Sequence, residues 1–230
     1  MEAQQVLHMN LSNGETSYAT NSNLQVPPTV ESDDKGNIYL ATRSPPTVFK
    51  GYLEQFQKDF SLFLSLGSKE ITPGGRMVIT MLGRKNEDLF GKEGYFFELL
   101  SKALNDLVSE GLIEEAQVDS FNLPFYMPSR KELEDIVCAE GSFYLDQLDI
   151  FDVNWDGSDY DDNEGFMFDR FISAQKTAKC IRAVVEPLIA YHFEDNIIDI
   201  LFSRYMENVS DHLSKEEGKF VNFVISLRGK

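Results

Sequence analysis

The stretch GGRMVITMLGR, residues 74–84, decides the fold class of this 230-residue chain. Its central part, Arg76 to Gly83, is a nearly continuous apolar run that follows the turn Pro73-Gly74-Gly75. Such a run predicts a β-strand covered on both faces, as found in a sheet that lies between helices. A strand of this kind predicts helices before and after it in the sequence.

Helical periodicity is present on both sides of this strand. Residues 44–67 carry apolar side chains three and four positions apart, and so do residues 95–110, which end at Gly111 in the position of a helix C-cap. Ser129 and Glu132 form an S-x-x-E capping box that opens a helix running to about residue 139. The flanking sequence thus supplies helices that can cover a sheet.

The second half of the chain continues this alternation. Residues 142–155 and 220–227 are expected to be strands, and residues 167–213 are helical in pattern with breaks near Pro187 and at Glu194-Asp195. Helices that alternate with a few buried strands predict an α/β fold. Three strands are few for so many apolar helix faces, which indicates that part of a larger sheet is missing.

Charge and composition exclude several function classes. The chain has 21 Lys and Arg against 38 Asp and Glu, a formal charge of −17, which disfavours binding to nucleic acid or to anionic membrane surfaces. No apolar stretch reaches the length of a membrane span, and the first residues do not resemble a leader, so a cytoplasmic location is expected. The two cysteines, Cys138 and Cys180, are expected to be buried thiols.

One irregular stretch gathers oxygen-bearing side chains. In VDSFNLPFYMPS, residues 118–129, Asp119 and Asn122 carry the carboxylate and amide oxygens that hard cations prefer. Asp and Asn are also ordinary turn residues, so a purely structural turn is the alternative. The sequence contains no GxSxG, HExxH, GxxxxGK[ST] or GxGxxG motif, which leaves hydrolase, zinc protease and nucleotide-binding signals absent.

Several longer phrases resemble one plant enzyme family. They run in order over nearly the whole chain and include KGNIYLATRSPPTVFKGYLEQFQKDFSLFL, GGRMVITMLGR, SEGLIEEAQVDSFNLPFYMPS, EGSFYLDQLDIFDVNWD, IRAVVEPLIAYHF and FVNFVISL. These phrases resemble the SABATH methyltransferases, which include the salicylate, benzoate and jasmonate carboxyl methyltransferases. The resemblance implies a Rossmann-like methyltransferase sheet with an α-helical cap, and a homodimer. It also implies methyl transfer from S-adenosylmethionine to a small aromatic or oxylipin carboxylic acid.

The resemblance also assigns residues to the cofactor and the substrate. Tyr18 resembles the tyrosine that contacts S-adenosylmethionine, where an aromatic face suits a sulfonium cation. Gln25 resembles the residue that hydrogen-bonds the substrate carboxylate. The apolar positions that line the aromatic-acid pocket correspond here to Phe97, Ile181, Val184 and Phe220. Burial on inward helix and strand faces would explain these four residues equally well.

A magnesium site is implied in the same way. Asp119-Ser120-Phe121-Asn122 matches the family segment that holds Mg²⁺, with Asp119 and Asn122 giving side-chain oxygens and Phe121 its carbonyl. No catalytic triad is implied, because a carboxylate acceptor is already ionised and methyl transfer requires alignment and desolvation instead.

The match is interrupted directly after Gln25. The family continues there into its cofactor-binding half, whereas this chain continues with Val26-Pro27-Pro28. The interpretation is an internally deleted member with two parts, a loosely packed segment at residues 1–36 and a core with its cap at residues 37–230. The expected structure is a partial sheet of about three strands, the last two antiparallel, with an unpaired edge at Arg76 to Gly83. The chain is expected to be inactive for want of the cofactor-binding strands, or to be a non-catalytic isoform that dimerises with full-length relatives.

Overall fold

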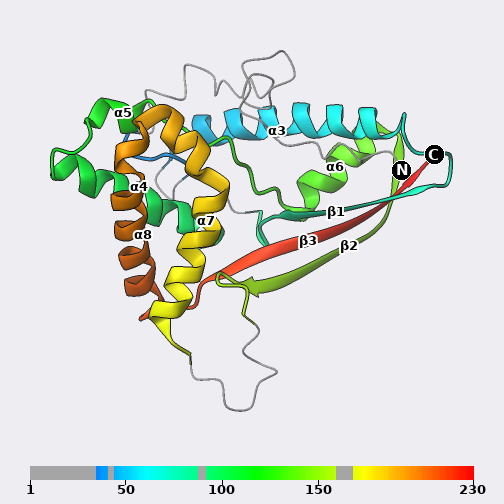
Figure 1. Ribbon diagram of the computed structural model, residues 1–230. Helices are drawn as coiled ribbons and strands as arrows, with labels where there is room; N and C mark the ends of the chain where they lie inside the picture. Colours follow the sequence, from blue (N-terminus) through cyan, green and yellow to red (C-terminus); the bar gives the residue numbers. More distant parts are fainter. Residues whose placement is uncertain (1–34, 41–43, 88–91, 159–167) are drawn as a thin grey trace, which may run out of the picture.

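The computed structural model describes residues 35–40, 44–87, 92–158 and 168–230. Helices α4, α7 and α8 gather at one end of the molecule, and a long, bent sheet with α3 and α6 occupies the other end (Figure 1). In chain order the elements are α3 (Pro46–Gly67), β1 (Arg76–Leu82), η1 (Lys92–Gly94), α4 (Tyr95–Ser109), α5 (Glu115–Asp119), α6 (Arg130–Glu140), β2 (Phe143–Asn154), α7 (Arg170–Phe193), η2 (Asp195–Ile197), α8 (Ile198–Leu213) and β3 (Lys219–Gly229).

The sheet has three described strands in the order β1-β3-β2. The last strand of the sequence, β3, lies in the centre and runs antiparallel to both neighbours, with Ile79 opposite Ile225 and Leu148 opposite the same Ile225. This arrangement confirms the expected partial sheet with β1 at an edge. The fold is mixed helix and strand, as the sequence predicted.

Only one face of the sheet is covered by helices. Phe223, Ile225 and Leu227 of β3 are fully buried against side chains of α3 and α6 such as Leu64 and Leu133. On β1, exposed residues alternate with half-buried ones, and Val78 is 66% exposed. The prediction that β1 is covered on both faces was therefore wrong, because the second face of the sheet has no helical layer among the described residues.

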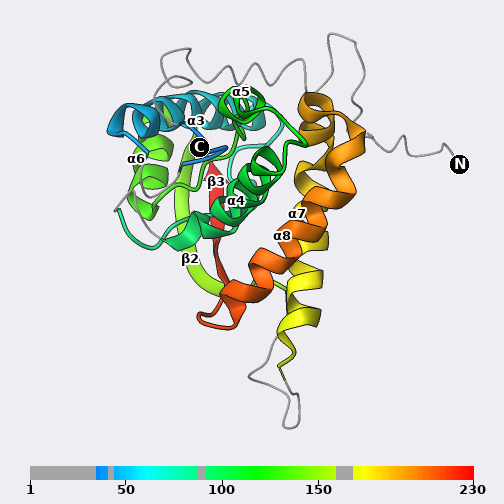
Figure 2. The ribbon, with the colours of Figure 1, turned by 90° about the vertical axis from the view of Figure 1, so that its left-hand side faces the viewer.

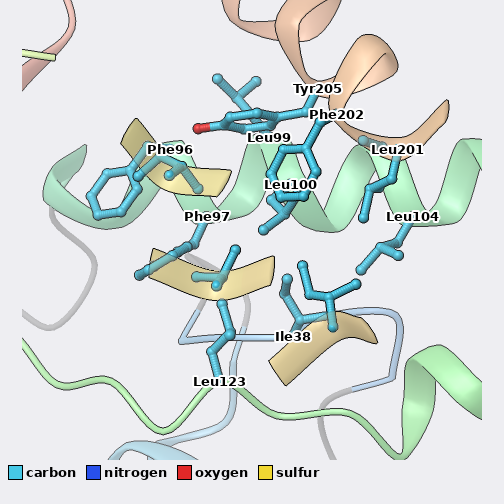
Figure 3. Close-up of a cluster of buried hydrophobic side chains, with 14 of the residues drawn as sticks. Ile38, Phe96, Phe97, Leu99, Leu100, Leu104, Leu123, Leu201, Phe202 and Tyr205 are labelled. Carbon is cyan, nitrogen blue, oxygen red and sulfur yellow. The ribbon is translucent and has the colours of Figure 1, made fainter. Parts of the chain in front are cut away.

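The helices at the other end form a compact cap. In Figure 2, α7 and α8 lie side by side, and α4 packs against α8. Their apolar faces enclose a core that includes the fully buried Leu100, Leu104, Leu201 and Tyr205, with Ile38 contributed by the segment before α3 (Figure 3). Most of the largest fully buried side chains of the described residues belong to this core.

Local sequence signals explain several helix boundaries. Ser129 accepts the backbone N–H of Glu132 at 3.2 Å, and Glu132 accepts the backbone N–H of Ser129 at 2.9 Å, which confirms the capping box at the start of α6. The expected break between α7 and α8 lies at Glu194, whose φ is 72°.

Two local predictions were wrong. Helix α7 continues through Pro187, which is exposed, so the Ala183 carbonyl that loses its hydrogen bond also faces solvent and can be hydrated. Cys138 and Cys180 are exposed on the outer faces of α6 and α7 instead of buried. Among the described helices, none combines the length and the apolar character that crossing a membrane requires.

Candidate functional site

The cluster around Phe97 contains three of the four residues predicted to line an acceptor pocket. Phe97 and Ile181 belong to the buried core of the cap, and Phe220 packs against this core from β3. The rings of Phe97 and Phe96 are 4.3 Å apart between centroids, and those of Phe96 and Phe220 are 5.0 Å apart at 83°. Two elements that are distant in sequence, α4 and β3, therefore meet in one aromatic cluster, and Ile181 of α7 belongs to the same buried core.

Further aromatic rings surround Phe97 on the side away from α8. Tyr39 lies 5.0 Å and Phe125 5.3 Å from the Phe97 ring centroid. Figure 3 shows Phe97 pointing from α4 toward the segments that carry Ile38 and Leu123. Phe97 is only 2% exposed, so its ring is enclosed by these neighbours.

Val184 does not join this cluster. It lies on the outer side of α7, 59% exposed, near Pro187 and the 89% exposed Tyr191. The inner side of α7 is also apolar, with Ile181, Val185 and Ile189 buried. A helix that is apolar on two sides has the composition of a helix covered on both. Val184 therefore faces a side that no described residue covers.

The predicted metal-binding residues lie together at the end of α5, where they hold the chain in place. Asp119 Oδ1 accepts the backbone N–H of Gly36 at 2.8 Å, and Asn105 Nδ2 donates to the Gly36 carbonyl at 2.8 Å. Gly36 has a φ of 74°, which favours glycine at this position. The Leu123 N–H donates to the Ile38 carbonyl at 2.6 Å. The carboxylate thus serves as an anchor for the segment that precedes α3.

The three predicted magnesium ligands would supply only part of the coordination shell of the ion, and the site stays a prediction. Mg²⁺ takes six oxygen ligands in a near-octahedral arrangement. Asp119 is the only carboxylate of the predicted set, and one of its oxygens already accepts an N–H. In the described part of the chain, no three His, Cys, Asp or Glu side chains gather as a metal cluster. The Phe121 side chain packs on His192 and Phe193, with ring centroids 5.0 and 5.2 Å away.

A buried ionic network joins the end of β1 to the start of α6. Arg84 is 6% exposed, forms an ion pair with Glu132, and donates to the Met127 carbonyl at 2.6 Å and to the Tyr126 hydroxyl at 3.2 Å. The Tyr126 hydroxyl in turn donates to Glu132 at 3.0 Å. Burial tends to lower the pKa of Arg84, but its hydrogen bonds and charge interactions with Glu132 and Tyr126 together outweigh this effect and raise the pKa above its usual value. Burial also raises the pKa of Tyr126.

The sequence interpretation missed this network. The capping box pointed to Glu132, but nothing in the pattern indicated that Arg84, 48 positions earlier, would be its charged partner. The network fixes the loop of residues 120–129 against the end of β1. This loop carries the Phe125 ring and directly follows Asp119.

A second missed feature is an open cavity at the far end of β2 and β3. Its volume is about 670 Å³, and its lining includes Trp155, Phe168, Ser173, Leu213 and Lys219. The Trp155 ring is stacked on His212 at 5.1 Å, and its buried Nε1 has no hydrogen-bond partner. The signal that could have found it is the single tryptophan of the sequence, the last residue of a predicted strand.

Tyr18 and Gln25, the residues predicted to contact the methyl donor and the acceptor carboxylate, lie outside the described residues. None of the described side chains is assigned to the methyl donor.

Comparison with known proteins identifies relatives over most of the chain. Residues 25–230 match the model of the family described as SAM dependent carboxyl methyltransferase. A benzoic acid/salicylic acid carboxyl methyltransferase from Petunia hybrida is 46% identical over 204 residues, 88% of this chain and 54% of the relative. The salicylate carboxymethyltransferase of Clarkia breweri is 43% identical over the same share of this chain and 56% of its own.

A solved structure agrees with these sequence matches. The structure of a loganic acid methyltransferase with SAH superposes with a TM-score of 0.75 at 30% identity, covering 89% of this chain and 56% of that one. The chain therefore spans little more than half the length of the relatives that it matches. In sequence and in fold, it belongs to the SAM dependent carboxyl methyltransferase family, the group that its sequence resembles.

Proposed function

We propose that this chain carries the acceptor-side part of an S-adenosylmethionine-dependent methyltransferase for small carboxylic acids, and that it transfers no methyl groups by itself. The cluster of Phe97, Ile181 and Phe220 is the observation that carries the first half of this proposal. Relatives at 43–46% identity are named for benzoic and salicylic acid, whose rings match an aromatic cluster in chemistry.

The chemistry that this cluster supports is alignment and exclusion of water. A carboxylate is already ionised near neutral pH, so its oxygen can attack a methyl carbon without a general base. S-adenosylmethionine, when bound, supplies the methyl group and leaves as the thioether. Apolar rings around an acceptor remove water from the attacking oxygen, which strengthens its interaction with a cationic donor.

The expected inactivity rests on what the chain does not span. The chain covers only 54% of its Petunia hybrida relative, and Val26 follows Gln25 where the family's cofactor-binding half begins. The outward position of Val184 also fits a pocket that lacks one wall. The deletion, the cytosolic location and the substrate class all stay predictions.

Transfer of a radiolabelled methyl group to salicylate, benzoate and jasmonate tests the proposal. We expect counts at background for this chain, with the Clarkia breweri salicylate carboxymethyltransferase as the positive control. In parallel, calorimetric titration with S-adenosylmethionine is expected to give no binding heat. Turnover above background with any of the three acids would contradict the proposed inactivity.

A second candidate function is that of a non-catalytic partner of full-length relatives. The uncovered apolar side of α7, with Val184 and Tyr191 exposed, favours it. Co-purification of a tagged full-length relative with this chain, lost on Val184→Lys, would support this candidate. Equal recovery with and without the substitution would exclude α7 as the contact.

A further inference from the structure

The outer edge of β1 presents unpaired backbone groups. Gly83 donates its N–H to the Val221 carbonyl at 3.0 Å, which fixes the phase of the β1–β3 ladder. Because successive residues of an antiparallel strand direct their N–H and C=O groups to opposite sides, Met77, Ile79 and Met81 bond to β3. Arg76, Val78, Thr80 and Leu82 therefore direct theirs outward, and no described strand pairs with them.

The two edges of the sheet differ in the features that prevent pairing with a strand of another chain. The β2 edge carries Asp146, Asp149 and Asp152 and has a bulge between Leu145 and Gln147. Charges and bulges are the usual devices that prevent edge association. The β1 edge has neither a bulge nor a proline, and its single charge, Arg76, is already near Asp146 at 3.7 Å.

The β1 strand is also complementary to itself. When two copies run antiparallel about a two-fold axis at Ile79, Val78 lies opposite Thr80 and Arg76 lies opposite Leu82. Every outward N–H and C=O then finds a partner, and no like charges oppose each other on this strand. The exposed faces match as well, because the even-numbered residues of both copies stay on the uncovered side of the sheet.

We infer that two copies of this chain associate through antiparallel pairing of their β1 strands into a continuous six-stranded sheet. Such pairing is closed by its symmetry, so it yields a dimer and no longer assembly. The formal charge of −17 on each copy opposes association, and salt screens this repulsion. This inference does not depend on methyl transfer, so a failed activity assay leaves it standing.

Sedimentation velocity over a concentration series at low and high salt tests the inference. We expect a monomer–dimer equilibrium that shifts toward dimer as salt rises. Val78→Lys should weaken dimerisation by about tenfold or more, because it places a charge at the centre of the paired edge. Phe151→Lys, which adds the same charge at an exposed site on β2, should leave the equilibrium unchanged, as should Val184→Lys on α7.

A cross-link tests the register independently of affinity. With Cys138 and Cys180 replaced by serine, Ile79→Cys places the two thiols on the two-fold axis at a spacing that a disulfide spans. We expect a disulfide-linked dimer on mild oxidation, and none for Phe151→Cys in the same background. A chain that stays monomeric at high salt, that forms larger assemblies, or whose dimer responds to Phe151→Lys or Val184→Lys instead of Val78→Lys would overturn the inference.

Discussion

The helical cap and the sheet of this molecule bury their apolar residues to very different extents. In the cap, Leu100, Leu104 and Tyr205 are fully buried among α4, α7 and α8. In the sheet, β3 is buried on one face, while Val78 on β1 and Tyr144 on β2 stay exposed on the other. The core of the cap is enclosed by helices of the same chain. In contrast, one face of the sheet and the outer edge of β1 have no partner among the described residues.

This difference shows that the apolar content of a segment does not determine its burial. The run at residues 76–82 is more apolar than most of the cap helices, yet it contains one of the most exposed valines of the described residues. Burial depends on which neighbours the rest of the chain supplies. Stability in the two regions should therefore respond differently to equivalent substitutions.

The largest effect is expected at the buried ion pair between the end of β1 and the start of α6 in the sheet region. Glu132→Ala removes the charged partner of Arg84, which is 6% exposed, and leaves a buried guanidinium unpaired. We expect a loss of about 3 kcal/mol or more in the free energy of unfolding, measured by urea denaturation. Glu134→Ala, on the exposed side of the same helix, is the matched control and should change it by less than about 0.5 kcal/mol. Equal effects of the two variants would show that the buried ion pair stabilises the fold no more than the exposed one.

Truncation of a buried leucine in the cap should cause a loss of unfolding free energy of similar size. Leu104→Ala removes a fully buried side chain from the core and should cost about 2–5 kcal/mol of unfolding free energy. Leu62→Ala, at a 57% exposed site on the helix that covers the sheet, should cost less than about 1 kcal/mol. Thermal unfolding of both variants provides the measurement, and similar losses for the two leucines would remove the contrast drawn above.

The smallest effect is expected at the start of α6. Ser129→Ala deletes the hydroxyl that accepts the Glu132 N–H, at a cost of about 1 kcal/mol in the free energy of unfolding. Ser129→Thr keeps this acceptor and should retain most of the stability. A Ser129→Ala variant as stable as the parent would mean that the Glu132 side chain alone holds this helix end.

Features with a local cause could be predicted from the sequence, and features with a distant cause could not. The capping box of Ser129 and Glu132 was predicted because its partners are three residues apart. The Arg84 contact was not, because the fold brings its partners together across 48 positions. Pro187 was expected to end a helix, and only its exposure in the packed cap explains why α7 continues.

The residues of the candidate site also include some whose positions could be predicted from the sequence and some whose positions could not. Phe97, Ile181 and Phe220 were predicted together and share one cluster, since apolar residues on inward faces converge on a core. Val184 shares the helix of Ile181 but points outward, and the family pattern alone did not show that this side would be uncovered. Asp119 was predicted as a metal ligand, yet its carboxylate bonds to a backbone amide that lies 83 residues earlier.

The position of β3 has a consequence for biosynthesis. This strand lies between β1 and β2 but follows both in the sequence, so neither flanking strand has its ladder partner until translation passes residue 219. During that interval the apolar β1 segment has emerged without the strand that later occupies its inner side, a state in which nascent chains are bound by chaperones or aggregate. The sheet can therefore be completed only after β3 has been synthesised, later than both of its flanking strands.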